Sequence, residues 1–421
     1  MGSYKDSGIE WIGEIPKGWE VNKYKFLGST KNGLTYTPED ITTESDGILV
    51  LRSGNIQNGQ LDFNDVVFVN TSIPNNLKLQ KNDILITARN GSANLVGKNI
   101  LINTEINATY GAFMMVFRAN RRINPRFAQY TMNPTFDNYK TFFTTSTVNQ
   151  LTANIFYNMA VPLPPLQEQA AIANFLDKKN AEIDAIIANI TKQIQTLKDY
   201  RQSLITETVT KGLDKTVAYK DSGIEWIGEI PEEWGIIKIK HAFKLFAGGD
   251  IDYNDYSDEQ EEFYQYPILA NSLENSGIIG FTSKYRFSGE TITITGRGSV
   301  GVAFYRNFPY FPVVRLLVGV PIRNLSTKYV TYCINSFDTI GEQTAMTQLT
   351  TDKLGVEKIP LPSLQEQAAI ADYLDDKTTK IDRIIVKKEQ QLDIIKEHRK
   401  SLIYEYVTGK KRVKEYQQDG N

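Results

Sequence analysis

Two blocks of sequence occur twice in this chain, and no other feature constrains its fold as strongly. Residues 4–16 recur without a change at 219–231, an offset of 215 positions. Residues 162–173 return as 360–371 with one residue changed, at an offset of 198 positions. Self-similarity over such distances indicates that one structural unit is built twice, so the fold must contain an internal pseudo-twofold repeat.

The segments between the repeated blocks differ from each other. Residues 22–160 and 237–358 share only scattered local patterns, and the second segment is the shorter. A duplication without further consequence would let all parts diverge together, whereas here the inserts differ much more than the frames. This contrast indicates that one scaffold presents two domains that bind different ligands.

The second block of each copy opens a long helix with coiled-coil spacing. Pro164 and Pro165 end the preceding segment, and apolar residues then follow a 4–3 spacing. Two equivalent helices related by a twofold axis run antiparallel, so we expect the variable domains at opposite ends of the pair. Gly212 and Gly409 are the predicted helix ends. The predicted seam consists of Leu176, Asn180, Ile183, Ile187, Ile190, Ile194, Leu197, Arg201 and Leu204 in the first copy, and of Leu374, Thr378, Ile381, Ile385, Lys388, Leu392, Ile395, Arg399 and Leu402 in the second.

The length of these helices suits a spacer between two DNA-reading domains. At 1.5 Å per residue, some 30 to 40 helical residues span roughly 45–60 Å, and successive major grooves on one face of DNA lie about 34–36 Å apart. Arg201 and Arg399 occupy matching seam positions, where they either fix the register or extend their stems to solvent. A coiled coil also serves as a plain dimerisation or adaptor rod, and the two dissimilar domains favour the spacer.

The predicted fold is of the α/β (α+β) class, with two mixed α/β domains separated by two long antiparallel coiled-coil helices. The predicted boundaries are 1–163 for the first domain with its repeat motif, 164–212 for the first helix, 213–361 for the second domain, 362–410 for the second helix and 411–421 for a polar tail.

The composition argues against several kinds of site. Cys333 is the only cysteine, so no intramolecular disulfide can form, and its apolar neighbours predict a buried structural thiol in a reducing cytoplasm. The two histidines, His241 and His398, lie far apart in the sequence, which makes a zinc site a poor fit. We find no run of 18 apolar residues and expect no membrane-spanning helix.

Local charge, rather than net charge, favours nucleic acid as a ligand. The chain has a net charge of −2 and a pI near 6.0, but only groups close to phosphates release counterions. Residues 22–160 contain 13 basic and 9 acidic side chains, a balance of +4. Residues 235–360 contain 12 and 13, and seven of those acids lie within 250–262. We expect this acidic run to be a solvated loop that faces away from DNA.

Both inserts contain a β-rich run followed by a related polar turn. Residues 83–87 precede a turn at 88–92, and residues 291–295 precede a turn at 296–299. An arginine beside glycine and serine at a strand end can reach a base edge or a phosphate, although an ordinary solvent-exposed turn fits about as well. The matching Gln-Leu-Thr segments before each long helix are equally interpretable as hinge or capping residues. The candidate DNA contacts are Arg52, Asn55, Arg89, Asn90, Ser92, Gln150 and Thr152 in the first domain, and Asn271, Arg297, Ser299, Gln348 and Thr350 in the second.

No catalytic motif is complete. Residues 133–136, Asn-Pro-Thr-Phe, are similar to the motif with which amino-methyltransferases hold a base, but the second proline is absent and no glycine-rich cofactor loop accompanies it. Residues 91–99 end in Gly-Lys-Asn and fail as a phosphate-binding loop. We therefore predict no catalytic residue and no metal site in this chain.

The repeated frame resembles the specificity subunits of type I restriction–modification enzymes. The resemblance rests on Gly-Ile-Glu-Trp-Ile-Gly-Glu-Ile-Pro in residues 8–16 and 223–231, and on the Pro-Leu-Pro-x-Leu-Gln-Glu-Gln opening of each helix. Both motifs occur in pairs and in the family's order, so the resemblance covers the whole chain. The variable domains match only in general pattern, as such a family implies.

The resemblance implies a set of partners. Each variable domain would read one half of a split DNA target, and the helices would set the gap. Two methyltransferase subunits would methylate one adenine per half-site with S-adenosylmethionine, and motor–nuclease subunits would cleave unmodified DNA with ATP and magnesium. None of these cofactors is expected in this chain. The motif residues Trp11, Trp226, Gln167 and Gln365 would make scaffold and subunit contacts.

Two other classes of function remain open from the sequence. One is a structural adaptor whose coiled coil links protein partners, and the positive balance of the inserts speaks against it. The other is a self-contained methyltransferase or nuclease, against which the missing cofactor and metal motifs count.

Overall fold

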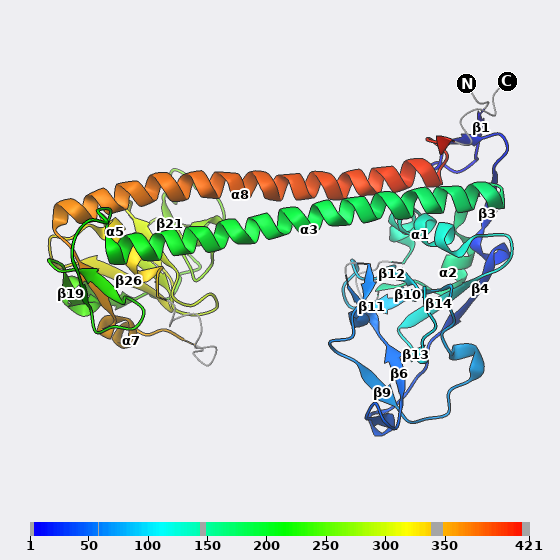
Figure 1. The fold of residues 1–421 in the computed structure, drawn as a ribbon, viewed down its shortest axis with the longest axis horizontal. Helices are drawn as coiled ribbons and strands as arrows, with labels where there is room; N and C mark the ends of the chain where they lie inside the picture. The colour runs from blue at the N-terminus through cyan, green and yellow to red at the C-terminus, as the bar shows by residue number, and fades with distance from the viewer. Residues whose placement is uncertain (1–3, 58, 144–148, 338–347, 415–421) are drawn as a thin grey trace. The chain divides into compact units, whose positions relative to one another are not determined.

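A computed structural model describes residues 4–57, 59–143, 149–337 and 348–414. The chain divides into two compact units, residues 1–189 with 391–421, and residues 190–390. The boundary between the units runs through both long helices, α3 (Leu166–Lys211) and α8 (Leu364–Val407) (Figure 1). Each variable domain and its share of both helices thus form one unit.

The first unit contains two four-stranded sheets. One sheet is antiparallel in the order β12-β10-β14-β4, and the other has the order β13-β6-β9-β5 with β13 parallel to β6. Its strands are β1 (Tyr4–Asp6), β2 (Glu14–Pro16), β3 (Glu20–Lys23), β4 (Gly28–Asn32), β5 (Ile41–Thr42), β6 (Ile48–Leu51), β7 (Ile56–Gln57), β8 (Gln60–Leu61), β9 (Val67–Val69), β10 (Asp83–Thr87), β11 (Arg89–Asn90), β12 (Asn99–Leu101), β13 (Ala108–Tyr110), β14 (Met114–Ala119), β15 (Asn149–Gln150) and β16 (Ala160–Leu163), and its helices are α1 (Pro125–Tyr139) and α2 (Ala153–Asn158).

Strand β10 explains the layering of this unit. All five of its residues are buried, as the predicted β-rich run at 83–87 requires. Side chains alternate across a strand, and Ile84 and Ile86 join a core with Phe127 of α1, while Leu85 joins a second core with Leu51 of the other sheet. The strand is therefore covered on both faces.

The second unit repeats this plan with different residues. Its antiparallel sheet has the order β20-β26-β23-β24, and a three-stranded sheet has the order β22-β21-β25 with β25 parallel to β21. Its elements are β17 (Tyr219–Asp221), β18 (Glu229–Pro231), β19 (Gly235–Lys238), α4 (Ile239–Ala242), β20 (Phe243–Ala247), β21 (Tyr266–Leu269), β22 (Ile278–Thr282), β23 (Thr291–Thr295), β24 (Ala303–Arg306), β25 (Phe311–Pro312), β26 (Leu316–Pro321), α5 (Thr327–Ile334), α7 (Thr351–Val356) and β27 (Lys358–Leu361). Cys333 lies buried in α5, which confirms the predicted burial of its thiol.

Helices α3 and α8 run antiparallel in each unit, as the twofold relation of the repeat predicted. In the second unit Arg201 forms an ion pair with Asp382 across the helices at 2.9 Å, and in the first unit Arg399 pairs with Asp184. These two pairs correspond exactly under the repeat, so the seam arginines bind the facing helix and fix its register. Most of the predicted apolar seam positions are buried or half-buried.

The end of each long helix completes the core of the unit opposite to its start. Val407 of α8 packs in the same core as Trp19, and Val209 of α3 packs in the same core as Trp234. Gly409 and Gly212 follow with φ of 76° and 71°. An added Cβ there would lie 3.1 Å from the Trp19 ring and 3.0 Å from the Trp234 ring, so both helix ends require glycine, as predicted.

No helix in the part of the chain that the structure describes is long and apolar enough to cross a membrane. Within those same ranges, no three or more His, Cys, Asp or Glu side chains gather closely enough to hold a metal ion.

Candidate nucleic-acid interface

Three candidate residues of the first domain meet in a short strand pair. Strands β11 and β15 are antiparallel, with Arg89 opposite Gln150 and Asn90 opposite Asn149. The backbone N–H of Leu151 also donates to the carbonyl of Ala88 at 2.8 Å. The turn at 88–92 and the Gln-Leu-Thr segment, 60 residues apart in the sequence, thus form one continuous surface on which Arg89, Ser92 and Gln150 are exposed.

Asn90 links this surface to the loop after β6. Its side-chain amide donates to the Ser53 hydroxyl at 3.3 Å, and its oxygen accepts from the backbone N–H of Ser92 at 3.0 Å. Lys98 reaches the Ser53 carbonyl at 3.5 Å, and partial burial lowers the pKa of its ammonium. Residues 52–55 therefore join the same cluster of loops.

Phe113 belongs to this cluster, although the sequence analysis did not select it. Its carbonyl accepts from the backbone N–H groups of Ala88 and Arg89 at 2.9 and 3.0 Å. The Arg89 guanidinium lies 5.4 Å from the centre of its ring, and the side chain is 61% exposed. An exposed aromatic ring under an arginine provides a stacking surface for bases. A lone phenylalanine in a loop carries no periodic signal, so only the fold reveals it.

The second domain builds the corresponding cluster with other residues. The N–H of Leu349 donates to the carbonyl of Gly296 at 2.9 Å, which matches the bond between Leu151 and Ala88. Arg297, Ser299 and Gln348 are exposed on the resulting surface. The same backbone connection thus presents Arg89 with Gln150 in one domain and Arg297 with Gln348 in the other.

Asn55 and Asn271 both hold these loops in place through their side-chain amides. Asn55 is 1% exposed, accepts from the Arg52 N–H at 2.9 Å, and donates to the carbonyls of Asp62 and Asp65. Its prediction as a DNA contact was wrong, because its amide is buried and occupied. Asn271 accepts from the Gly296 N–H at 2.7 Å and donates to the Val314 carbonyl at 3.3 Å, so its amide is also engaged with the loop.

Thr152 and Thr350 act as helix caps. Thr152 accepts from the Ile155 N–H at the start of α2, and Thr350 accepts from the Lys353 N–H at the start of α7, both at 3.3 Å. Of the two interpretations left open by the sequence, the geometry supports capping. Arg52 pairs with Asp65 at 2.9 Å and keeps its side chain 36% exposed.

A buried arginine supports the loop at residues 274–277 of the second domain. Arg306 of β24 is 5% exposed and donates to the Thr293 hydroxyl at 3.0 Å and to the Ser276 carbonyl at 2.7 Å. Within the described ranges it forms no ion pair, and burial lowers the pKa of its guanidinium to about 10. It fixes a loop in which Asn275 and Ser276 have φ of 46° and 54°, a backbone that L-residues rarely adopt.

The acidic run at 250–262 is mostly exposed, as expected of a solvated loop. Asp255 connects this run to the neighbouring strand and loop, because its carboxylate accepts from the hydroxyls of Thr282 and Ser283 at 2.8 and 2.9 Å.

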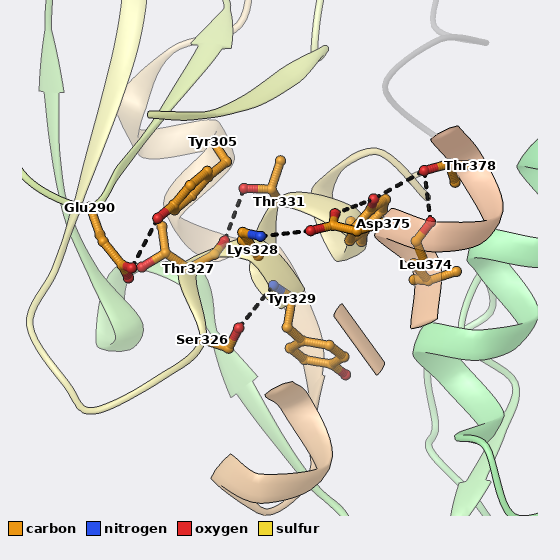
Figure 2. Close-up of polar contacts among 11 residues, drawn as sticks. Glu290, Tyr305, Ser326, Thr327, Lys328, Tyr329, Thr331, Leu374, Asp375 and Thr378 are labelled. Atoms are coloured by element: carbon orange, nitrogen blue, oxygen red, sulfur yellow. Dashed lines mark hydrogen bonds and ion pairs between the residues drawn. The ribbon is translucent and has the colours of Figure 1, made fainter. Parts of the chain in front are cut away.

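The two domains are attached to their long helices by matching polar networks. In the second, Lys328 contacts Asp375 of α8 at 2.6 Å (Figure 2). The Tyr332 hydroxyl donates to the same carboxylate at 2.7 Å. Burial is the main cause that raises the pKa of Tyr332 to about 12. In the first, Arg126 and Tyr130 bind Asp177 of α3, both at 2.6 Å. These networks orient each domain on its helix.

The repeated motif is also anchored twice in the same way. The Trp19 indole donates to Glu168 at 2.9 Å and the Trp234 indole to Glu366 at 3.0 Å. Buried Gln169 and Gln367 bind the backbone before their helices. These residues, rather than the exposed Gln167 and Gln365, form the scaffold contacts within the chain.

Trp11 and Trp226 pack against Tyr404 and Phe337. Each has a buried indole Nε1 without a hydrogen-bond acceptor among the described residues. Contacts of Trp11, Trp226, Gln167 and Gln365 with another subunit remain predictions, as does any such role for Arg201 and Arg399. The motif-like residues 133–136 lie inside α1, where Asn133 accepts from the side chain of Asn99.

Comparison with known proteins identifies relatives over nearly the whole chain. The family model described as the type I restriction modification DNA specificity domain matches residues 16–196 and 231–393. A Methanocaldococcus jannaschii protein is 27% identical over 425 residues, which cover 96% of each chain. Its name, which is a provisional assignment, is the type I restriction enzyme MjaX specificity subunit. The type I restriction enzyme EcoKI specificity subunit of Escherichia coli K12 is 31% identical over 202 residues, 46% of this chain and 43% of that one.

A solved structure shows the same fold. It concerns complex assembly and conformational transition of the type I R-M system, and one of its chains superposes with a TM-score of 0.71 at 16% identity. The match covers 93% of this chain and 98% of that chain.

Proposed function

Because this chain belongs to the type I restriction–modification DNA specificity family, we propose that each of its two variable domains reads one half of a bipartite DNA target. The observation that carries the proposal is the loop cluster that occurs in both domains. An identical backbone bond presents an exposed arginine and glutamine in each, while the surrounding side chains differ. A shared frame whose surrounding side chains differ suits the reading of two different half-sites.

The candidate base or phosphate contacts are Arg89, Asn90, Ser92 and Gln150 in the first domain and Arg297, Ser299 and Gln348 in the second. Arginine binds guanine through O6 and N7, and glutamine binds adenine through N6 and N7. The acidic run at 250–262 is then placed away from the phosphates, which it would repel.

The long helices set the number of base pairs between the half-sites in this proposal. Their 46 and 44 residues are continuous helix, and the two seam ion pairs fix one register between them. A continuous paired helix transmits a change of length to the spacing of the target, whereas a flexible linker would tolerate many spacings.

The chain acts in this proposal as a non-catalytic subunit. Its partners are double-stranded DNA, two methyltransferase subunits and motor–nuclease subunits, and S-adenosylmethionine, ATP and magnesium belong to those partners. Since its substrate is the DNA of the cell, we place its action in the cytoplasm.

Half-site-selective substitutions test the proposal. Arg297→Ala should cost about 1–3 kcal/mol at one base position of the second half-site if the arginine binds guanine in bidentate fashion. Arg89→Ala should act only on the first half-site. The readout is the methylated fraction of single-base variants of the target, with each unaltered half-site as the internal control. A loss that is uniform over all sequences would identify a phosphate contact instead, and a loss at both half-sites from either substitution would contradict separate reading.

A further inference from the structure

A hollow of about 690 Å³ opens in the first domain beside the cluster of loops that presents Arg89 and Gln150. Its walls come from residues 34–38, Ile41, residues 52–54, Asp65 and residues 111–114. This volume lies within the range of ordinary small-molecule sites. Neither the domain's fold nor the contacts of Arg89 and Gln150 account for it.

The hollow is continuous with the surface assigned to DNA. Ser53, in its wall, accepts the hydrogen bond of Asn90, and Phe113 carries the Arg89 guanidinium over its ring. DNA that is bound by Arg89 and Asn90 therefore lies at the mouth of the hollow. A part of the bound DNA is therefore the ligand that can most directly enter the hollow.

The lining suits a nucleobase better than a phosphate. Phe113 and Ile41 are 61% and 51% exposed, so apolar and aromatic surface faces the opening. The Asp65 side chain is 89% exposed at its edge and would repel a phosphate. The Arg52 side chain is 36% exposed, and its Nη2 pairs with Asp65 at 2.9 Å. A guanidinium N–H beside an aromatic ring is suited to the acceptors and the flat face of a base.

The second domain differs at the two positions that matter. An isolated parallel bridge joins Leu34 to Gly111 in the first domain, and the corresponding bridge in the second domain joins Gly249 to Val313. Val313 therefore corresponds to Gly111. Two residues further on, Arg315 corresponds to Phe113. An added Cβ on Gly111 would meet its nearest neighbours, in Val50, Arg52 and Tyr36, only at 3.8 to 3.9 Å. The wall of the hollow thus lacks a side chain at Gly111, where a Cβ would make only ordinary van der Waals contacts, and the second domain has Val313 at the corresponding position.

We propose that this hollow receives one nucleobase of the first half-site, unstacked from the duplex and held against Phe113 with the Arg52 guanidinium at its edge. The proposal rests on the proposed function of this domain as a DNA reader. Extruding a base costs stacking and pairing energy, which the aromatic wall and the arginine offset. The first domain then selects its half-site partly by how readily that base leaves the duplex.

Abasic scanning tests the proposal with the full chain assembled with its methyltransferase subunits. Dissociation constants are measured on target duplexes in which each nucleotide of the first half-site is replaced in turn by an abasic nucleotide. Gly111→Leu fills the hollow and should weaken binding of the intact target on the order of tenfold, the usual contribution of base–aromatic stacking. At one position only, the abasic target should bind wild type and Gly111→Leu equally. Val313→Leu, at the corresponding position of the second domain, is the control and should leave the first half-site unaffected.

Each other outcome overturns the proposal. Equal binding of all targets by Gly111→Leu and wild type would show that no base enters the hollow. Gly111→Leu could instead abolish assembly with the methyltransferase subunits, with Gly111→Ala and Phe113→Leu weakening assembly to a smaller degree. That result would show that a protein side chain fills the hollow. If no DNA sequence is preferred by wild type, the proposed function fails together with this inference, whereas a preference without base-specific coupling removes this inference alone.

Discussion

Replacement of Arg306 by methionine should impair reading of the second half-site and leave the first intact. Ile102 is the residue of the first domain that corresponds to Arg306, because it bonds to Asp83 at the start of β10 as Arg306 pairs with Thr291 at the start of β23. Ile102 is apolar and 1% exposed, so the fold does not need a charge at this position. The guanidinium instead holds the loop at residues 274–277, which carries two non-glycine residues of positive φ. Each such residue costs on the order of 1–3 kcal/mol, so the loop relaxes when its anchor is removed.

The expected loss of stability is modest. Two hydrogen bonds from a charged donor contribute about 1.5–3 kcal/mol each, but removal of a buried unpaired cation returns several kcal/mol of desolvation. Thr293 is fully buried, so its hydroxyl loses the arginine as a hydrogen-bond partner at a cost of about 1–3 kcal/mol. We therefore expect about 1–3 kcal/mol of net destabilisation and a roughly tenfold loss of discrimination at the second half-site.

Two measurements check this expectation. Methylated fractions at single-base variants of the target should show a relaxed second half-site beside an unchanged first half-site. Hydrogen exchange should accelerate at residues 272–277 and in the turn at 296–299. The exposed Arg323→Met is the control for a changed arginine in the same domain. An unchanged motif with unchanged exchange would refute the role of Arg306, and an equal loss at both half-sites would indicate misfolding.

Three further predictions concern the scaffold. Glu168 is 2% exposed and pairs with Arg412 at 2.9 Å, so Glu168→Gln should cost about 1–3 kcal/mol of local stability in the first unit, measured by hydrogen exchange around Trp19. The matched Glu366 has no ion pair within the described residues, and burial raises the pKa of its carboxyl. A carboxyl whose pKa is raised by folding makes the protein more stable as pH falls through that pKa. Glu366→Gln should therefore be neutral or stabilising at pH 7, and its effect should vanish in acid. A loss of stability like that of Glu168→Gln would contradict this asymmetry. Deletion of one heptad from each long helix removes about 10 Å of rise and should shorten the gap of the methylated motif or abolish binding, whereas an unchanged gap would disprove the spacer.

The sequence predicted the frame because the frame is local and repeated. Heptad spacing predicted the paired helices, and the repeat predicted that they are antiparallel. The two proline-led openings predicted their starts, and Gly212 and Gly409 predicted their ends. Matching turns also led to Arg89 and Arg297, since a strand followed by Gly and Ser is a local pattern. These features depend on neighbours in the chain, which a sequence displays.

Features that arise from distant contacts could not be predicted in the same way. Asn55 looked like a ligand contact, but its carbonyl partners at Asp62 and Asp65 appear only when the loop closes around it. Phe113 and Arg306 acquire their roles from strands far away in sequence, and neither has a repeated counterpart of the same type. The seam pairing of Arg201 with Asp382 likewise depends on the register between two helices.

A methylation map tests the central claim most directly. The chain is expressed with its methyltransferase subunit in a host without restriction, and the genomic DNA is sequenced with detection of N6-methyladenine. The account predicts a split motif of two different half-sites that is present only when this chain is present. A soluble complex that yields no motif, or the same motif without this chain, would contradict it.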